Sequence, residues 1–248
     1  MRSIGIIDSG IGGYSVAKAI HALSTVNIVF LADQKNMPYG NRSKEDLLGI
    51  MKNNISWFQA MGIDEVLIAC NTASIVAPQL QEAFPDMKIH GLIDYTVEQL
   101  IGTSYEELLV LGTKATIESG QYQEKLKKYL PDTTVTAIKC PALAELVELG
   151  NQNDIKKYIS SLLQDYKDTK VPLLLACTHY SIVHTIITDF VGGGYYDSEI
   201  AIAPMFQNYE GEGRFIVYTS GSSEQLRSQL EVIFHDNDKE IKKQDQEI

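Results

Sequence analysis

Two stretches of the chain repeat one pattern: EVLIACNTAS at residues 65–74 and PLLLACTHYS at residues 172–181. In each, a short apolar run passes through alanine into a cysteine and a polar cluster, where a helix is expected to begin. A continuous apolar run of about four to eight residues is typical of a strand that is covered on both faces, as in a parallel sheet. The repeat therefore predicts two similar strand–loop–helix units, each with a thiol at the end of its strand.

Similar apolar runs alternate with helix-period segments along the rest of the chain, which is typical of an α/β fold with parallel strands. The expected strands cover residues 4–7, 27–32, 65–69, 88–93, 108–112, 134–138, 172–176, 195–197 and 214–218. The clearest helix begins after the N-cap Ser43 and stops at Gly62, with an apolar face of Leu47, Ile50, Met51, Ile55 and Phe58. We expect a domain boundary near residues 93–103 and a frayed polar tail at residues 235–248.

Composition and charge exclude several classes of protein. The 248 residues are 44% hydrophobic and 21% charged, which argues against a disordered or fibrous chain. A net charge of −11 disfavours binding to nucleic acids or to anionic membranes. The N-terminus lacks the pattern of an export signal and no apolar stretch is long enough to span a membrane, so we expect a cytoplasmic protein.

The cysteines and histidines predict neither a disulfide framework nor a metal site. The three cysteines are widely spaced without a CxxC motif, and the five histidines lack the spacing of metal ligands. Cys140 is followed by Pro141 and apolar residues, so we interpret it as structural.

Cys70 and Cys177 are different, because each stands at the carboxyl end of a predicted strand, where parallel sheets bind ligands. An isolated cysteine is more often a buried, inert residue. Here, however, polar side chains follow both thiols: Asn71 and Thr72, and Thr178 and His179. Two thiols on opposite sides of a carbon can remove a proton from one face and return one to the other. Such a reaction inverts a stereocentre, and it needs a positioned thiolate and a stabilised carbanion.

The glycine-rich loop after the first strand allows two interpretations. Gly10 and Gly12, with Asp33 after the next strand, imitate a dinucleotide-binding fingerprint. Ser15 replaces its third glycine, however, and Asp8 would repel a pyrophosphate. The glycines fit better as a binding site in which backbone amides and a helix N-terminus contact a small carboxylate. Asp8 could then contact an ammonium group or take part in proton transfer. Helix capping by Asp8 and its neighbour is the plain alternative.

Other loops give weaker signals. The turn at residues 38–43 and the TKAT segment at residues 113–116 offer polar donors, although ordinary turns and caps also explain them. His179 is close enough in sequence to tune Cys177. Glu145 and Glu148 lie three residues apart on one short helical segment, and the residues alone do not choose between them.

At these residues the chain resembles the glutamate racemases, within the cofactor-independent aspartate/glutamate racemase superfamily. The matching segments are IGIIDSGIGG at 4–13, MPYGNRS at 37–43, ACNTAS at 69–74, GTKATIESG at 112–120, CPALAELVELG at 140–150, CTHYSIV at 177–183 and YTSG at 218–221. The chain departs from the family pattern at residues 93–95, at Glu145 and at Tyr180-Ser181, positions that bear on hinge geometry, assembly and substrate preference.

The resemblance implies two pseudo-symmetric parallel-sheet α/β domains with the active site in the cleft between them. Residues 1–95 and 207–248 would form the domain that carries Cys70, and residues 96–206 the domain that carries Cys177. It further implies racemisation of glutamate without pyridoxal phosphate, metal or nucleotide, a supply of D-glutamate for peptidoglycan, and a homodimer. A racemase of another acidic amino acid such as aspartate, and a non-catalytic protein that binds an acidic ligand, are the alternatives.

The resemblance also implies roles for individual residues. Cys70 and Cys177 would be the acid/base thiols, Asp8 would assist the first and His179 the second, and Glu148 would be the acidic residue of the family's V-E-x-G turn. The implied substrate-binding set is Asp8, Ser9, Pro38, Tyr39, Gly40, Cys70, Asn71, Thr72, Thr116, Cys177, Thr178 and His179.

Overall fold

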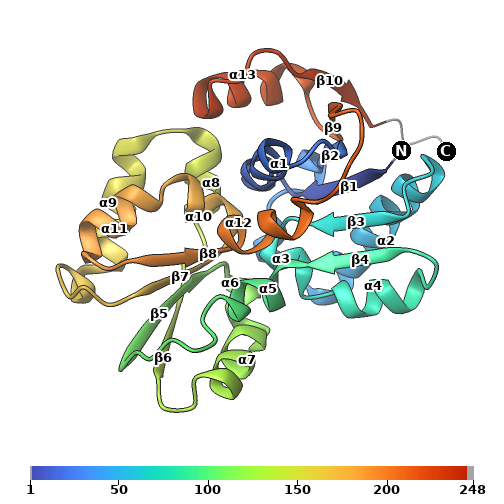
Figure 1. Ribbon diagram of the computed structural model, residues 1–248. Coiled ribbons are helices and arrows are strands. Elements are labelled where there is room, and N and C mark those ends of the chain that lie inside the picture. The colour runs from blue at the N-terminus through green and yellow to red at the C-terminus, as the bar shows by residue number, and fades with distance from the viewer. Residues whose placement is uncertain (1, 245–248) are drawn as a thin grey trace.

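The chain folds into two parallel β-sheets with helices on both faces of each (Figure 1). The structure is a computed structural model that describes residues 2–244. The first sheet has the strand order β10-β9-β2-β1-β3-β4 and the second has the order β6-β5-β7-β8. All neighbouring strands are parallel. The predicted α/β fold with two parallel sheets is therefore confirmed.

The elements alternate along the chain as the sequence predicts. The strands are β1 (Ser3–Asp8), β2 (Asn27–Ala32), β3 (Glu65–Ile68), β4 (Lys88–Gly91), β5 (Glu107–Gly112), β6 (Thr134–Lys139), β7 (Leu173–Ala176), β8 (Tyr195–Asp197), β9 (Phe215–Thr219) and β10 (Glu240–Lys243). The α-helices are α1 (Gly12–Leu23), α2 (Lys44–Ala60), α3 (Asn71–Ser74), α4 (Ala77–Ala83), α5 (Leu92–Glu98), α6 (Lys114–Glu118), α7 (Gln121–Tyr129), α8 (Leu143–Leu149), α9 (Gln152–Leu162), α10 (Thr178–Ile182), α11 (His184–Val191), α12 (Ser198–Ile202) and α13 (Ser223–Phe234). Short 3-10 turns lie at Gln34–Asn36 (η1), Tyr39–Asn41 (η2), Gln164–Tyr166 (η3) and Ala203–Phe206 (η4).

The two sheets share one topology. In β2-β1-β3-β4 and in β6-β5-β7-β8, the second strand of the unit lies on one side of the first strand and the third lies on the other. The strand order thus reverses between β1 and β3 and between β5 and β7. Ligands bind at the carboxyl edge of a parallel sheet where the order reverses. Asp8 ends β1, Cys70 follows β3 and Cys177 follows β7, so all three lie at such points.

Alternate residues of each central strand pack into different cores. Ile4 and Ile6 of β1 belong to the cluster that includes side chains of α1 and α13, whereas Ile7 packs with side chains of α2 and α4. In β5, Leu109 and Val110 likewise belong to separate clusters. A fully buried aliphatic side chain contributes about 1.5–3 kcal/mol. Burial on both faces is why these strands are apolar at nearly every position.

Helix α2 matches its prediction at the start. The Ser43 hydroxyl accepts a hydrogen bond from the Asp46 N–H at 3.1 Å, which caps the helix. The helix ends at Ala60, and Gly62 follows with φ of +75°. Leu47 and Phe58 are buried on the predicted apolar face, whereas Ile50 is only half-buried.

Two expectations about secondary structure are wrong in part. The expected strand at residues 88–93 is too long: β4 ends at Gly91 and Leu92 begins α5. The Leu92 N–H donates to the Ser74 hydroxyl at 2.9 Å instead of to a neighbouring strand.

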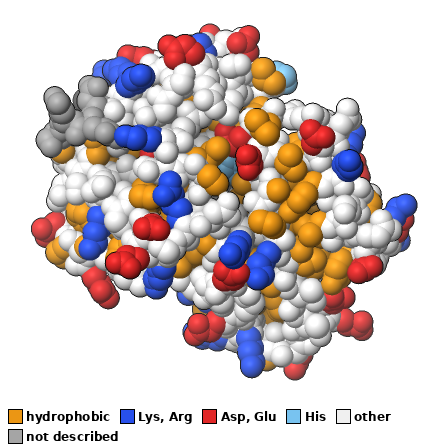
Figure 2. Space-filling view, turned by 180° about the vertical axis from the view of Figure 1, so that it is seen from behind, with side chains coloured by type: hydrophobic (Ala, Val, Ile, Leu, Met, Phe, Trp, Pro, Cys, Tyr) orange, Lys and Arg blue, Asp and Glu red, His pale blue; other side chains and the backbone are white. Residues whose placement is uncertain are grey.

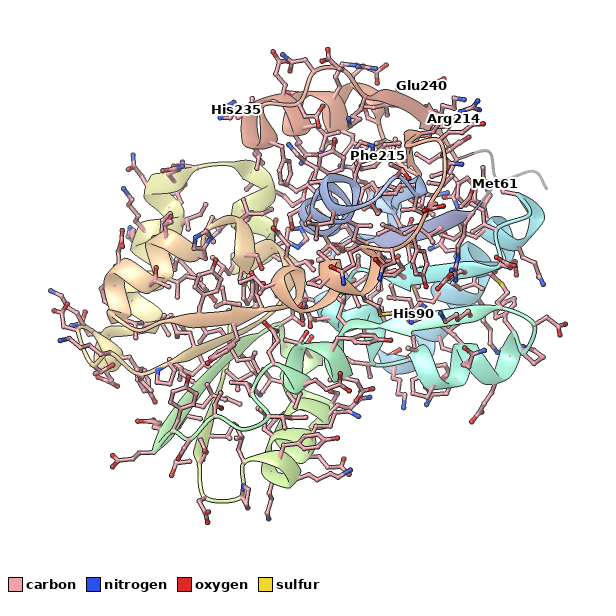
Figure 3. All side chains as sticks on the ribbon, viewed as in Figure 1. Met61, His90, Arg214, Phe215, His235 and Glu240 are labelled. Carbon is pink, nitrogen blue, oxygen red and sulfur yellow. The ribbon has the colours of Figure 1, made fainter. Side chains whose placement is uncertain are left out.

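The polar tail is the second correction, because residues 240–243 form strand β10 instead of fraying. This strand pairs in parallel with β9 at the edge of the first sheet, and Figure 3 shows Glu240 near Arg214 and Phe215. Ile241 packs against the core, while its charged neighbours stay exposed or half-exposed, which is typical of a protected edge strand. Residues 245–248 of the predicted tail lie outside the described residues.

The surface is mixed in character. On the face shown in Figure 2, charged side chains of both signs are spread from the rim to the centre, and hydrophobic side chains gather in the middle and toward the right. Among residues 2–244, none of the helices is both long and apolar enough to cross a membrane.

Candidate active site

The two predicted thiols line one cavity. Cys70 and Cys177 occupy the N-cap positions of α3 and α10, with extended backbones (φ of −140° and −160°), and each is about 95% buried. The cavity is small, about 30 Å³, which is room for about one water molecule. Its walls are Ser9, Met37, Pro38, Tyr39, Gly40, Asn41, Cys70, Thr72, Thr113, Pro141, Ala144, Glu145, Cys177 and His179. These residues come from the carboxyl-edge loops of both sheets.

Beside Cys177 stands an imidazole–carboxylate pair. His179 Nδ1 lies 4.0 Å from Cys177 Sγ, and His179 Nε2 lies 2.7 Å from Glu148 Oε1. Burial alone would lower the pKa of His179, but the contacts with Cys177 and Glu148 outweigh burial and raise this pKa well above its usual value. The imidazole can therefore hold a proton next to the Cys177 sulfur.

Beside Cys70 stands a carboxylate. Asp8 is fully buried; its Oδ1 accepts a bond from the Ser9 hydroxyl at 3.1 Å and its Oδ2 accepts one from the Thr178 hydroxyl at 2.9 Å. Burial raises the pKa of Asp8, although the nearby His179 opposes this. Burial, together with the negative charge of Asp8, also raises the pKa of Cys70 well above its usual value.

The residues after Cys70 connect the two sheets. Thr72 Oγ1 lies 2.9 Å from Thr113 Oγ1 and 3.1 Å from Thr116 Oγ1, so three hydroxyl groups form one cluster. Asn71 points elsewhere: its side-chain amide bonds to the Ser198 hydroxyl at 3.0 Å and accepts a bond from Tyr122. This arrangement leaves Thr72, and not the Asn71 side chain, at the cavity.

The glycines of the first loop allow close contact between the two halves. A Cβ at Gly10 would overlap Glu148 Oε1, and a Cβ at Gly12 would lie 2.6 Å from His179 Nδ1. The Ile11 N–H donates to Glu148 Oε1 at 2.8 Å. A carboxylate does sit at the start of α1, as the glycines suggested, but it belongs to the protein's own Glu148.

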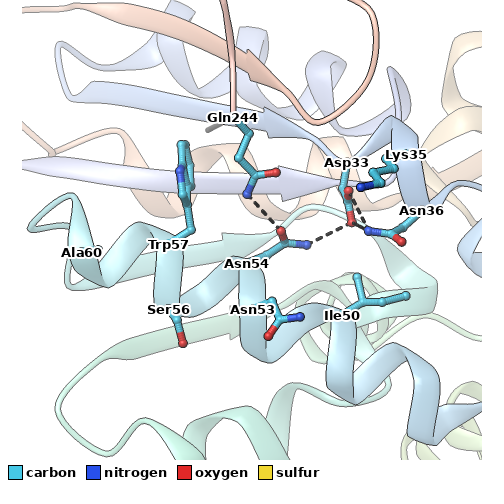
Figure 4. Close-up of a pocket in the computed structure, with 10 residues that line it drawn as sticks. All are labelled: Asp33, Lys35, Asn36, Ile50, Asn53, Asn54, Ser56, Trp57, Ala60 and Gln244. Carbon is cyan, nitrogen blue, oxygen red and sulfur yellow. Dashed lines mark hydrogen bonds between the residues drawn. The ribbon is translucent and has the colours of Figure 1, made fainter. Parts of the chain in front are cut away.

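Asp33, the acidic residue of the dinucleotide-like pattern, is fully engaged within the protein. Its Oδ2 accepts bonds from the Tyr39 hydroxyl at 2.6 Å and from the Asn54 amide at 3.0 Å. The Asn36 amide donates to the same carboxylate, and Gln244 donates to Asn54 (Figure 4). Asp33 thus holds Tyr39, a wall of the cavity, in place.

The structure brings together most of the predicted site. Eight predicted residues line the cavity: Ser9, Pro38, Tyr39, Gly40, Cys70, Thr72, Cys177 and His179. Asp8, Thr116, Glu148 and Thr178 lie behind the walls, bonded to residues of the site, whereas the Asn71 side chain bonds to Ser198, away from it. Sequence reasoning missed Met37, Asn41, Thr113, Pro141, Ala144 and Glu145 as walls, although Thr113 belongs to the polar loop that it singled out.

Cys140 fits its structural interpretation. It is buried, and burial raises its pKa to about 12. Within residues 2–244 there is no group of three histidine, cysteine or acidic side chains placed to hold a metal ion.

Comparison with known proteins identifies the family. The family model described as Asp/Glu/Hydantoin racemase matches residues 15–202. The chain belongs to this family. It is an amino-acid racemase, an isomerase, and its predicted resemblance to the glutamate racemases is confirmed. The glutamate racemase of Aquifex aeolicus is 36% identical over 239 residues, which is 93% of each chain.

Solved structures of this racemase family share the fold over nearly the whole chain. The glutamate racemase of Aquifex pyrophilus has a TM-score of 0.79 at 30% identity, covering 97% of this chain and 98% of that one. The glutamate racemase of Francisella tularensis in complex with D-glutamate has a TM-score of 0.88 at 22% identity, covering 99% and 98%. The second likeness concerns the fold alone.

Proposed function

We propose that this racemase interconverts L- and D-glutamate without a cofactor, using Cys70 and Cys177 as its two acid/base groups. The observation that carries the proposal is that both thiols line one cavity, each on a loop from a different sheet and each beside its own proton-carrying partner. Its curated relatives at 32–37% identity are glutamate racemases, which supports glutamate as the substrate.

The proton balance of the proposed reaction is simple. One cysteine, as thiolate, takes the α-proton and becomes a thiol, while the electron pair of the C–H bond stays on the substrate as a carbanion. The other cysteine, as thiol, gives its proton to the opposite face of that carbon and becomes a thiolate. The reverse reaction uses the same two groups in exchanged roles, so His179 and Asp8 would exchange protons with them between turnovers.

The closed cavity sets a condition on this proposal. Since it holds about one water molecule, glutamate can enter only after the loops from the two sheets move apart. Closure would then remove water from around the substrate, which strengthens every electrostatic interaction in the site. The hydroxyl cluster of Thr72, Thr113 and Thr116 and the backbone amides at the strand ends would face the substrate's carboxylates.

The biological part of the proposal follows from the product. We propose that the D-glutamate supplies peptidoglycan synthesis and that the enzyme acts as a cytoplasmic homodimer. Residues 1–95 with 207–248, and residues 96–206, would be the two domains that part to admit substrate.

The experiment is proton NMR in heavy water with the purified protein and no added cofactor. L-glutamate and D-glutamate are followed separately for loss of the α-hydrogen signal and of optical activity, with aspartate in parallel. Exchange with both glutamate enantiomers supports the proposal. Exchange with aspartate alone would favour the other acidic amino acid, and binding of glutamate without exchange would favour a non-catalytic protein.

A further inference from the structure

Glu148 is held from two sides, and only one side belongs to the site described above. Its Oε1 accepts bonds from His179 and from the Ile11 N–H. Its Oε2 accepts a bond from the side-chain amide of Gln229 at 2.6 Å, and the same amide lies 3.2 Å from the Glu148 carbonyl oxygen. Gln229 lies on α13, which packs on the first sheet, whereas Glu148 lies on α8 beside the second.

Gln229 is the last member of a chain of hydrogen bonds that starts at the end of β9. The Gly221 N–H donates to Thr219 Oγ1 at 2.9 Å, and the Thr219 hydroxyl donates to Gln34 Oε1 at 3.0 Å. Gln34 Nε2 then donates to Gln229 Oε1 at 2.7 Å. The chain therefore runs from a backbone N–H to the Glu148 carboxylate through one hydroxyl and two amides.

The direction of this chain is fixed at its Glu148 end, because the Thr219 hydroxyl can both donate and accept. A backbone N–H can only donate, and an ionised carboxylate can only accept. Each amide between them must turn its oxygen toward Gly221 and its NH₂ group toward Glu148, since a flip of either would place two acceptors or two donors together. The alternative amide orientations are therefore excluded by the network itself.

The frame around the chain is closely packed. Thr219 is fully buried, and a Cβ at Gly221 would lie 2.9 Å from Gln34 Cβ, so the glycine allows the close approach. On α13, Leu226 and Leu230 pack in the core of the first sheet on either side of Gln229 in sequence. Gln229 is thereby held at a fixed place, with its amide aimed across to α8.

We propose that Gln34 and Gln229 are positioning residues of the racemase: they hold the Glu148 carboxylate against His179 and, through it, the imidazole against Cys177. The inference rests on the proposed two-thiol reaction, because it assigns His179 to one of the thiols. Neither glutamine lines the cavity. Their effect on turnover is carried entirely through Glu148.

The inference predicts a specific loss in Gln229→Ala. Without its donor, Glu148 Oε2 faces an unfilled space and the carboxylate can rotate away from His179. The turnover number should fall about 10-fold, below the 10²–10⁴ that a general acid or base contributes itself, while KM changes less than about 2-fold. Gln34→Ala should give a smaller loss in the same direction, and the double variant should resemble Gln229→Ala, because the two residues act in series.

The decisive readout is independent of activity. The protein is labelled at its histidines, and the His179 ring is titrated by NMR in the full chain. Three charged or titratable groups face this ring: Glu148, Cys177 and Asp8. In Gln229→Ala the pKa of His179 should be lower than in the wild type, because the Glu148 carboxylate that raises it is no longer held in contact. The basic limb of the turnover profile should shift to lower pH by the same amount.

Gln225→Ala is the matched control. It is the same substitution on the same helix, but its side chain is exposed and lies one turn away from Gln229. It should leave the rate, the His179 titration and the melting temperature unchanged. A Gln229→Ala protein that melts as the wild type and titrates like Gln225→Ala would overturn the inference, whatever its rate. If the wild type showed no α-hydrogen exchange, the proposed function would fail, and the His179 titration would still decide whether the glutamines hold Glu148.

Discussion

The two thiol loops have the same backbone and opposite electrostatic surroundings. Cys70 and Cys177 both follow a central strand and cap a short helix with an extended backbone. Cys70 is influenced by a buried carboxylate, Asp8, whereas Cys177 lies beside an imidazole, His179, with a raised pKa. Repetition of a unit thus supplied two similar thiols, and Asp8 outside the repeat and His179 within its second copy made them different.

The two loops also cross over to each other's sheet. Thr72, after Cys70, bonds to Thr113 and Thr116 at the carboxyl edge of the second sheet. Thr178, after Cys177, donates to Asp8 at the end of β1 in the first sheet. Each thiol loop is therefore held by the opposite half, so the relative position of the thiols depends on contacts between the halves.

The largest expected effect tests whether both thiols are needed. Cys70→Ser and Cys177→Ser should each reduce racemisation by about 10³-fold or more, because a serine hydroxyl holds its proton too tightly to act as a base near neutral pH. The measurement is loss of optical rotation with each glutamate enantiomer. Cys140→Ser, a buried thiol outside the cavity, is the control and should retain most of the activity. A fully active Cys70→Ser or Cys177→Ser variant would show that the reaction does not need both thiols.

The next effect tests the imidazole side. Glu148→Gln keeps the shape of the side chain but removes the charge that raises the pKa of His179. The turnover number should fall about 10²-fold near pH 8 and less near pH 6. The loss appears only at pH values where the wild-type imidazole carries its proton and the imidazole of the variant does not. A pH–rate profile of kcat measures this. Equal losses at both pH values would show that Glu148 acts by shape and not by charge.

A stability difference is expected at the opposite ends of the two strands. Glu65 begins β3, where burial would raise its pKa but hydrogen bonds from His90, Lys88, Tyr209 and Arg2 lower it to about 2. A lowered pKa stabilises the fold at pH values above the ordinary 4.5, and this stability is lost as the pH falls from 4.5 to about 2. The second repeat has Pro172 before β7 in place of this carboxylate.

Glu65→Gln should therefore destabilise the protein by about 2 kcal/mol at pH 7, or about 30-fold in the folded-to-unfolded ratio, and by less near pH 3. Denaturant unfolding at both pH values measures the effect. Glu107→Gln, at the start of β5, is the control: its carboxylate accepts a bond from Thr136 at 3.2 Å, and no ion pair is recorded for it among residues 2–244. Equal losses in the two variants would refute the difference.

A smaller effect is expected on the carboxylate side. Asp8→Asn removes the negative charge that helps to raise the pKa of Cys70, so this pKa should fall. Titration of the thiolate by its ultraviolet absorbance, in a Cys140→Ser and Cys177→Ser background, measures the shift. The turnover number should change by about 10-fold, with the acidic limb of the profile at lower pH. An unchanged Cys70 titration would show that the charge of Asp8 does not make the pKa of Cys70 differ from that of an ordinary thiol in this site.

The smallest effect concerns the mouth of the cavity. Glu145 is exposed and lines the cavity from α8, three residues before Glu148. Its charge repels a substrate with two carboxylates, although solvent screens the repulsion. Glu145→Gln should lower KM for glutamate about 2-fold at low salt and leave kcat unchanged. The difference should vanish at high salt, and a change in kcat instead would place Glu145 in the reacting site.

Sequence reasoning succeeded where the signal was local. The apolar runs gave the central strands, and Ser43 with Asp46 gave the start of α2. It failed at β10, because an edge strand needs only one inward side chain, Ile241, and its charged neighbours look like a loose tail. It had no means to find Gln229, because a half-buried glutamine on an amphipathic helix has no distinguishing pattern.

The sequence by itself determined the two repeated units and the place of a thiol at the end of each strand, since strand period and chain reversal are encoded within about ten residues. The residue pattern alone did not choose between Glu145 and Glu148, the family resemblance selected Glu148, and only the tertiary structure decided that Glu148 meets His179. That choice depends on contacts over long separations in the chain: Ile11 and Gln229 approach Glu148 from 137 and 81 residues away. Such contacts produce no periodic pattern in the sequence, because they depend on how the two sheets pack together and not on the local sequence.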